Sequence, residues 1–297
     1  MARDKIYSEE EFPSPLLQLW FNFKQTNVAM LGLYGYLFFL ILAIFSPLLM
    51  PHNAIESNLD LILLPPSWDK LGDVSYLLGT DGLGRDILSR LIHGATLTFG
   101  LSFIVVVLSL IIGVLIGSLS ALTQGIKSSI FNHFLDVILS IPTLLLAIII
   151  VAILGPGLSN TLWAIVMTLI PQFVHITHNA VKEELSKDYV LASRLDGASL
   201  LRILQYSVFP NIIEKIVTQA TLAQSAAILD IAALGFLGLG AQSPLSEWGA
   251  MVFNGLDLFY IAPWTVYLPG LAILFAVLTT NLVGEGLRHA VKMRKES

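Results

Sequence analysis

Cysteine is absent from this 297-residue chain, and charged residues are scarce, at 12% of the sequence. The absence of cysteine excludes disulfides, thiolate metal sites and cysteine nucleophiles. A soluble domain carries about a quarter charged residues, so half of that share excludes an ordinary soluble protein. Hydrophobic residues make up 55% of the sequence and occur in runs along its whole length. The composition therefore places the chain among membrane proteins.

Motifs for nucleotide hydrolysis and for other catalysis are missing as well. The segment Gly125-Ile-Lys-Ser128 lacks the first glycine of a phosphate-binding loop and follows a predicted membrane span instead of a strand. The glycines between Gly235 and Gly240 have no βαβ unit around them, which excludes a dinucleotide site. There is no Gly-x-Ser-x-Gly elbow and no His-Glu-x-x-His helix. We expect no catalytic residue, no metal site, no bound cofactor and no nucleic-acid partner for this chain.

Six apolar runs have roughly the length of 20 residues that crosses the hydrocarbon layer. They cover residues 28–49, 96–122, 137–154, 162–176, 216–239 and 264–283. The fourth is short, and the fifth contains a carboxylate, Asp230. Small residues in the second run, including Gly113 and Gly117, would let helices approach closely within lipid. The sequence predicts an all-α polytopic membrane protein with about six transmembrane helices.

Lysine and arginine are distributed unevenly among the segments between these runs. With the N-terminus inside, thirteen of the sixteen basic residues lie on the inner side, and three, namely Lys70, Arg85 and Arg90, lie outside. This bias predicts that both termini are cytoplasmic, which fits an even number of spans. We expect a cytoplasmic N-terminal segment over residues 1–27 and a transmembrane domain over 28–297. The domain would include an outer loop, about 51–93, and an inner loop, about 178–215.

The inner loop contains a pattern typical of two short helices that meet at a glycine. Asp188 is the predicted N-cap of the first helix. Gly197 stands where a helix ends in a left-handed residue. Ser199 is then the predicted N-cap of the second helix, which Pro210 would end. By themselves these features describe an amphipathic cytoplasmic linker.

The same segment resembles the Glu-Ala-Ala (EAA) loop of ABC importer permeases. The chain matches the spacing of that motif with Leu191-Ala192-Ser193, Gly197, Ser207, Phe209 and Pro210. It departs from the family pattern at Leu191, Ser193, Ser207 and Phe209. With Asp188 as N-cap, Leu191 would occupy the third helical position, where it lacks the carboxyl group that completes a capping box.

Further segments are similar to the C-type permease of dipeptide, oligopeptide and nickel importers. The first is an outer-loop motif over 78–90, with Gly79, Asp81, Gly84, Arg85 and Asp86; the others cover 233–242, 247–251, 269–273 and 281–288. Segments 63–68, 194–199 and 228–233 are most similar to the Sap branch of this family, which is associated with antimicrobial peptides. The resemblance covers nearly the whole chain in order.

The resemblance implies a type I ABC importer permease fold in the bacterial inner membrane. The chain would pair with a homologous B-type permease and form half of a pathway for peptides. Two ATPase subunits would bind ATP and Mg and carry out hydrolysis, and a periplasmic solute-binding protein would deliver the cargo. The cargo could instead be a polyamine, haem or a metal, and the sequence does not distinguish import from export. An ATP-independent secondary transporter, the competing class, would need several buried charges in its spans.

The resemblance also predicts functional residues. The ATPase-coupling residues would be Asp188, Tyr189, Leu191, Ala192, Ser193, Arg194, Gly197 and Pro210. Asp230 would either line the pathway for cationic cargo or bond to Ser225, to a neighbouring helix or to the partner permease. In the outer loop, Gly82 and Gly84 indicate a tight turn that opens a short amphipathic helix on the membrane surface.

Overall fold

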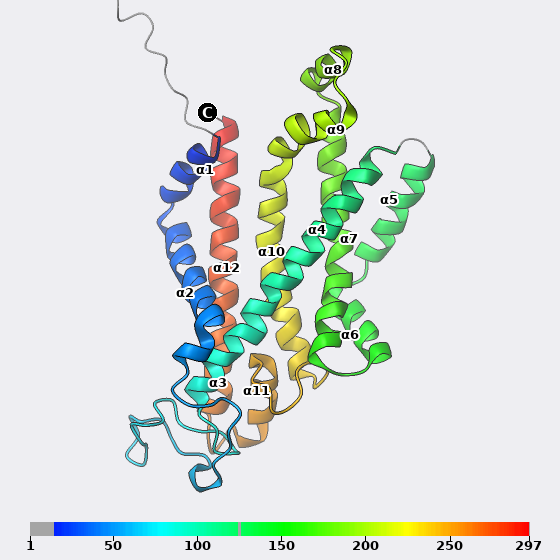
Figure 1. Ribbon diagram of the computed structural model, residues 1–297. Coiled ribbons are helices and arrows are strands. Elements are labelled where there is room, and N and C mark those ends of the chain that lie inside the picture. The colour runs from blue at the N-terminus through cyan, green and yellow to red at the C-terminus, as the bar shows by residue number, and fades with distance from the viewer. Residues whose placement is uncertain (1–14, 124–125, 297) are drawn as a thin grey trace, which may run out of the picture.

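A computed structural model describes residues 15–123 and 126–296, and these residues form an elongated helical bundle (Figure 1). Within them, the α-helices are α1 (Pro15–Lys24), α2 (Asn27–Leu49), α3 (Ile87–Gly94), α4 (Leu101–Ala121), α5 (Ile126–Leu139), α6 (Thr143–Leu154), α7 (Leu158–Leu185), α8 (Asp188–Leu195), α9 (Leu200–Ile203), α10 (Phe209–Phe236), α11 (Trp248–Gly255) and α12 (Trp264–Glu296). Four shorter turns are η1 (Leu59–Leu61), η2 (Ala95–Gly100), η3 (Leu204–Val208) and η4 (Leu256–Leu258), of which η2 and η3 are π-helical.

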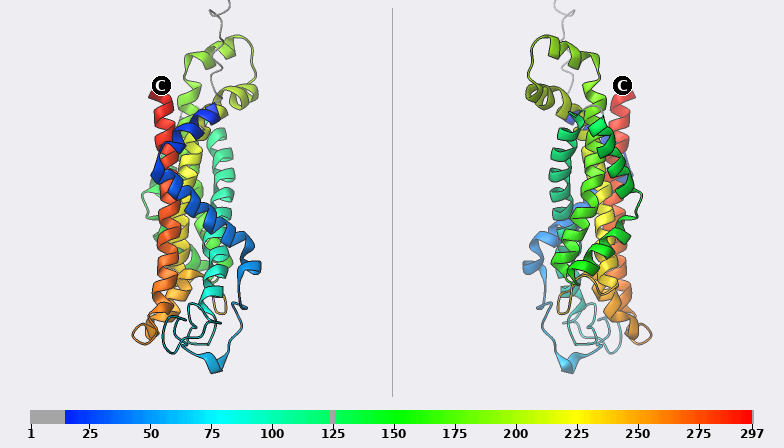
Figure 2. Two further views of the ribbon diagram at one scale, coloured as in Figure 1. Left: turned by 90° about the vertical axis from the view of Figure 1, so that its left-hand side faces the viewer. Right: turned by 90° about the vertical axis from the view of Figure 1, so that its right-hand side faces the viewer.

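The two ends of the bundle differ in construction. Helices α8 and α9 protrude from one end, where α1 and the end of α12 also lie (Figure 2). The outer loop, α11 and the start of α12 form the opposite end. The predicted inner and outer loops therefore lie at opposite ends of the bundle, as a membrane protein with this topology requires.

The expected number of membrane spans is confirmed. Five helical stretches are long and apolar enough to cross a membrane, and a sixth span is present if one bent helix pair is counted as a unit. The five stretches cover 27–49, 87–121, 158–185, 200–236 and 264–293. Because each helix pairs its own backbone groups, this architecture leaves few of them unsatisfied in lipid.

The third span is not the continuous helix that the apolar run 137–154 predicted. It is broken between α5 and α6, which meet at an angle of 88°. The break contains Pro142, which stands at the N-cap of α6 with extended backbone. A proline disfavours helical backbone in the residue before it, here Ile141, and this local restriction ends α5.

The fourth and fifth spans are longer than the apolar runs that predicted them. Helix α7 extends to Leu185, well beyond the predicted end at residue 176, and its polar residues His178 and Glu184 are buried there. Pro210 does not end the second inner-loop helix. It stands in the first turn of α10, directly after the π-helical turn η3, and the helical stretch 200–236 runs through it.

The centre of the bundle is the contact between α4 and α7. A Cβ added to Gly113 would lie 2.3 Å from Cβ of Phe173, and one added to Gly117 would lie 2.7 Å from Cβ of Thr177. The two backbones thus approach as closely as only glycine allows. Buried apolar residues of α6 and α10, including Val151 and Ile231, complete this core.

The outer loop has a defined fold, stabilised by two glycines with positive φ. Gly79 has φ of +77° and Gly84 has φ of +70°, whereas Gly82 is not left-handed. The Asp86 carboxylate then caps α3 by accepting the Ser89 N–H at 2.8 Å. The sequence predicted a separate helix on the membrane surface here, and this prediction is wrong. Helix α3 continues through η2 into α4.

A cysteine-labelling experiment tests the orientation, and the absence of native cysteine makes each introduced thiol unique. Asp73 and Lys187 are exposed at opposite ends of the bundle. We expect Asp73→Cys to react with an impermeant maleimide added to the periplasmic side. Lys187→Cys should react only after the membrane is opened. Labelling of both positions from one side would contradict this topology.

A glycine substitution tests the outer-loop fold. A Cβ at Gly84 would lie 1.8 Å from the Asn58 carbonyl oxygen, and its positive φ adds strain of about 1–2 kcal/mol. We expect Gly84→Ala to loosen the loop and to speed its cleavage by a protease added from the periplasmic side. Gly82→Ala is the matched control, since its Cβ would meet only the mobile end of Leu258. Equal cleavage rates for the two variants would refute this assignment.

Candidate functional site

The first helix of the inner loop begins one residue earlier than the sequence predicted. Lys187 occupies the N-cap position of α8 without a side-chain cap, and Asp188 is the first helical residue. The prediction of Asp188 as N-cap is therefore wrong. Leu191 is the fourth helical residue and does not occupy the third position, where a capping box would place its carboxyl group. Lys187 pairs instead through Nζ with a carboxylate oxygen of Glu184 at 2.8 Å.

The junction between the two inner-loop helices is the predicted left-handed glycine. Gly197 has φ of +81°, and its N–H donates to the Arg194 carbonyl at 3.0 Å. The Ala198 N–H donates to the Ser193 carbonyl at 3.1 Å, which completes a Schellman motif. Ser199 caps α9 by accepting the Arg202 N–H at 3.4 Å, as predicted. The turn is thus fixed by backbone bonds and by one positive φ.

Tyr189 connects α8 to the bundle. Its hydroxyl donates to Glu184, a buried carboxylate near the end of α7, and accepts from Asn211 Nδ2 at 3.0 Å. Partial burial and the Glu184 carboxylate raise the pKa of Tyr189 to about 12, so the phenol remains a donor at neutral pH. The sequence predicted Tyr189 as an ATPase contact and missed Glu184 and Asn211, because no local motif links three residues on different helices.

An apolar core holds the same helix from its other face. Val190 of α8 is fully buried and packs in a cluster with Val181 of α7, Ile203 of α9 and Val208 of η3. Side chains from three elements therefore close over one residue of α8. The inner loop is attached to α7 and α10 by packing as well as by hydrogen bonds, so it can move with them as one body.

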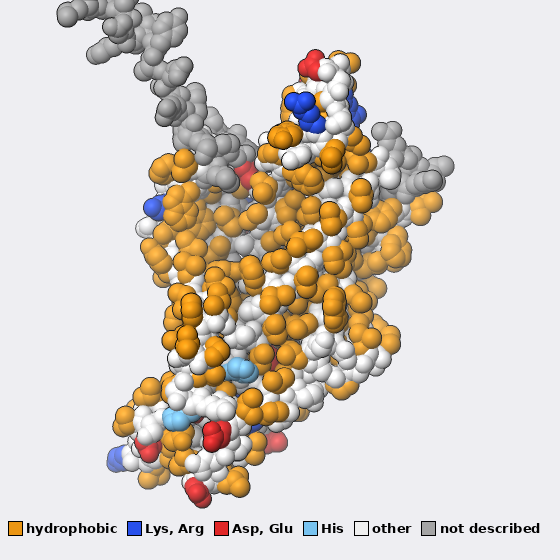
Figure 3. All heavy atoms as spheres, viewed as in Figure 1, with side chains coloured by type: hydrophobic (Ala, Val, Ile, Leu, Met, Phe, Trp, Pro, Cys, Tyr) orange, Lys and Arg blue, Asp and Glu red, His pale blue; other side chains and the backbone are white. Residues whose placement is uncertain are grey.

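The opposite side of the inner loop is exposed and partly apolar. Leu191 is 56% exposed and Leu195 81% exposed, and Ala192 and Arg194 are also exposed beside them. Basic side chains, with an acidic side chain at the tip, lie on this protruding end of the molecule (Figure 3). Apolar side chains that project away from the bundle and have basic neighbours are typical of a surface that binds another protein.

Asp230 is buried inside the subunit. It lies in α10 with 7% exposure, close to the Thr143 side chain. Its Oδ2 has no hydrogen-bond partner among the described residues. Thr143 opens α6, so the Asp230 carboxylate lies beside a neighbouring helix of the same chain. The role of Asp230 as a pathway residue stays a prediction.

The outer-loop motif brings three charged side chains together. Asp81 Oδ1 accepts the backbone N–H groups of Leu83 at 2.8 Å and Arg85 at 3.0 Å. Asp81 Oδ2 lies 2.8 Å from Arg85 Nε and 3.5 Å from Arg90 Nε. Arg90, almost fully buried, also donates to the Ala54 carbonyl at 3.1 Å. The sequence singled out Asp81 and Arg85 by resemblance but did not predict that one carboxylate bonds both arginines.

A second carboxylate organises the helix that follows the fifth span. Glu247 is fully buried and caps α11 by accepting the N–H groups of Gly249 and Ala250, both at 2.8 Å. It also accepts the Thr98 hydroxyl at 3.0 Å. A Cβ on Gly235 would lie 1.9 Å from Glu247, so α10 and α11 are in direct contact. No sequence motif predicted this role for Glu247.

The sequence matches known families over most of its length. The family described as "Binding-protein-dependent transport system inner membrane component" matches residues 113–296. The family described as "N-terminal TM domain of oligopeptide transport permease C" matches residues 14–66. The chain is 49% identical over 291 residues to the peptide transport system permease protein SapC of Escherichia coli O6:H1, with 98% of each chain covered. It is 48% identical over 280 residues to the di/tripeptide transport system permease protein DppC of Pseudomonas aeruginosa, covering 94% of this chain and 92% of that protein.

A solved structure shares the fold. A chain of the inward-facing MetNI methionine ABC transporter superimposes with a TM-score of 0.53 at 18% identity, covering 68% of this chain and 97% of that one. At this identity the likeness supports the fold alone, and it confirms the predicted ABC importer permease architecture. Together with the family matches, it shows that the chain belongs to the binding-protein-dependent transport system inner membrane components, the permease subunits of ABC transporters.

Proposed function

We propose that this permease carries peptides, and that it forms half of their pathway across the bacterial inner membrane with a homologous B-type permease. The observation that carries the proposal is the end-to-end identity of 49% with a peptide transport system permease. The similar identity to a di/tripeptide permease supports the same class of cargo. Antimicrobial peptides are included, since they share the peptide backbone. Polyamine, haem or metal is the alternative cargo.

We infer that two ATPase subunits bind at the inner loop and that a periplasmic solute-binding protein delivers the cargo at the opposite end. The exposed side of α8 would contact the ATPase with Leu191, Ala192 and Arg194. Both termini would be cytoplasmic. Because α8 is bonded to α7 through Glu184 and packed against η3, movement of the ATPase would be transmitted to two membrane spans.

Reconstitution in liposomes tests this function. We expect ATP-dependent peptide uptake when the chain is assembled with its partner permease, the ATPases and the binding protein. The purified chain alone should hydrolyse no ATP, since its sequence contains no phosphate-binding loop. Uptake of a polyamine, haem or metal without peptide uptake would refute the proposed cargo. ATP hydrolysis by the isolated chain would refute the assignment of hydrolysis to separate ATPase subunits.

A pair of substitutions at Gly197 tests the coupling role. No heavy atom lies within 4 Å of a Cβ placed there, so a side chain at this position is restricted by the positive φ alone. Valine strongly disfavours that φ, whereas asparagine tolerates it. We expect Gly197→Val to remain inserted but to lose at least about 1 kcal/mol at the turn, with reduced transport and weaker co-purification of the ATPases.

Gly197→Asn is the matched control and should retain most of both activities. The measurement compares transport and ATPase co-purification at equal amounts of membrane-inserted permease. Normal values in Gly197→Val would mean that the inner loop is a linker without a coupling role.

A further inference from the structure

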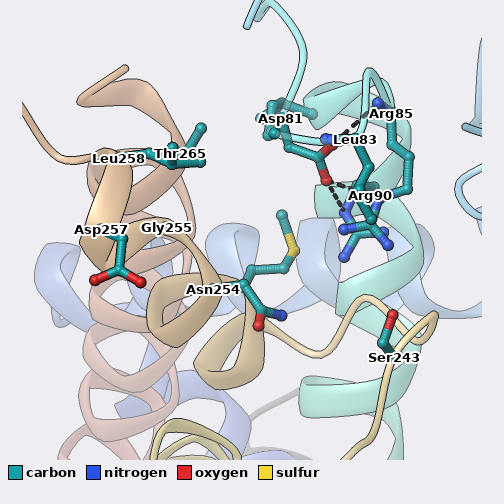
Figure 4. Close-up of a pocket in the computed structure, with 13 residues that line it drawn as sticks. Asp81, Leu83, Arg85, Arg90, Ser243, Asn254, Gly255, Asp257, Leu258 and Thr265 are labelled. Carbon is teal, nitrogen blue, oxygen red and sulfur yellow. Dashed lines mark hydrogen bonds and ion pairs between the residues drawn. The ribbon is translucent and has the colours of Figure 1, made fainter. Parts of the chain in front are cut away.

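A cavity of about 340 Å³ opens at the outer end of the permease (Figure 4). It lies between the outer-loop motif on one side and the end of α11, η4 and the start of α12 on the other. Its polar and charged lining residues are Asp81, Arg85, Arg90, Ser243, Asn254, Asp257 and Thr265. The volume is at the small end of the range, roughly 300–1,000 Å³, that is typical of small-molecule sites.

One wall of this cavity carries a net positive charge. Two guanidinium groups, of Arg85 and Arg90, share the single carboxylate of Asp81. Arg90 is further satisfied by the carbonyls of Ala54 and Pro244. Arg85 uses only its Nε for Asp81, and its two terminal nitrogens have no hydrogen-bond partner among the described residues.

The arrangement leaves one edge of a buried guanidinium available. Arg85 is 5% exposed and is one of the residues that line the cavity. The two terminal nitrogens of an arginine form a planar fork that matches a carboxylate. The positive wall is therefore chemically suited to a second carboxylate, from a ligand.

The opposite wall has the complementary charge. Asp257 of η4 lines it and forms no ion pair in the described part of the chain. The Asn254 carboxamide lies between Asp257 and the arginines (Figure 4). A ligand with a carboxylate at one end, an ammonium at the other and an amide between them would complement all three groups.

We propose that this cavity binds a short peptide as a zwitterion, with its carboxylate on Arg85 and its ammonium group on Asp257. The inference rests on the proposed function, because a peptide released at the outer end of the permease would meet this cavity before the membrane spans. A cavity of this size admits a dipeptide or the end of a longer chain. The cavity recognises a peptide by its two charged ends and makes few contacts that depend on the peptide's side chains.

The test is equilibrium binding of dialanine to the permease pair with its ATPases in lipid nanodiscs, without the solute-binding protein. Asp257→Asn should weaken dialanine binding about tenfold, the loss of one charge-assisted hydrogen bond. It should leave N-acetyl-dialanine unchanged, since that ligand has no ammonium group. Asp60→Asn, at an exposed outer-loop carboxylate outside the cavity, should change neither ligand.

The role of Arg85 is tested with a ligand that lacks the C-terminal carboxylate. Arg85→Gln should abolish the preference of the wild-type complex for dialanine over dialanine amide. If that variant does not fold, the Asp257 comparison still decides the proposal. Equal weakening of dialanine and N-acetyl-dialanine by Asp257→Asn, or no weakening of either, would overturn it.

Transport measured in parallel separates this site from the proposed function. If the wild-type system takes up peptide but Asp257→Asn does not change dialanine binding, the proposed site is wrong and the proposed function is retained. The expected binding pattern, combined with no peptide uptake, would retain the site and refute the cargo.

Discussion

The contact of α4 with α7 is the constraint on which the rest of this permease depends. Within lipid, burial of apolar surface gives helices little reason to associate, so close backbone packing must hold them. Gly113 and Gly117 provide that closeness against Phe173 and Thr177. Helix α7 also packs against α6 and α10 and carries α8 at its end. Its position therefore fixes both the core and the inner loop.

The two ends of the molecule satisfy their polar groups in different ways. At the outer end, buried carboxylates of Asp81, Asp86 and Glu247 accept backbone N–H groups, so loops and helix starts are bonded within the chain. At the inner end, internal bonds converge on Glu184, while the far side of α8 stays exposed. The polar groups of the outer end are therefore satisfied within the chain, whereas the inner end leaves one side of α8 exposed.

Local features of this fold could be predicted from sequence, and features that depend on distant partners could not. The number of spans follows from apolar length, and the turn at Gly197 follows from a residue that alone accepts positive φ easily. The first turn of α8 was misplaced by one residue because Asp188 is a residue type typical of an N-cap, whereas Lys187 occupies that position. Pro142 is a local signal for the break in the third span, but the apolar run 137–154 was interpreted as one continuous helix.

Helix α10 has a mechanical consequence that neither loop reveals alone. Helix α10 has 28 residues and, at about 1.5 Å per residue, extends about 42 Å from the inner loop toward the outer end. A stiff rod of that length, tilting about its middle, moves its two ends in opposite directions. At Gly235 there is no free space against Glu247, so α11 must follow the rod. A tilt of α10 at its inner-loop end would therefore displace α11, at the outer end, in the opposite direction.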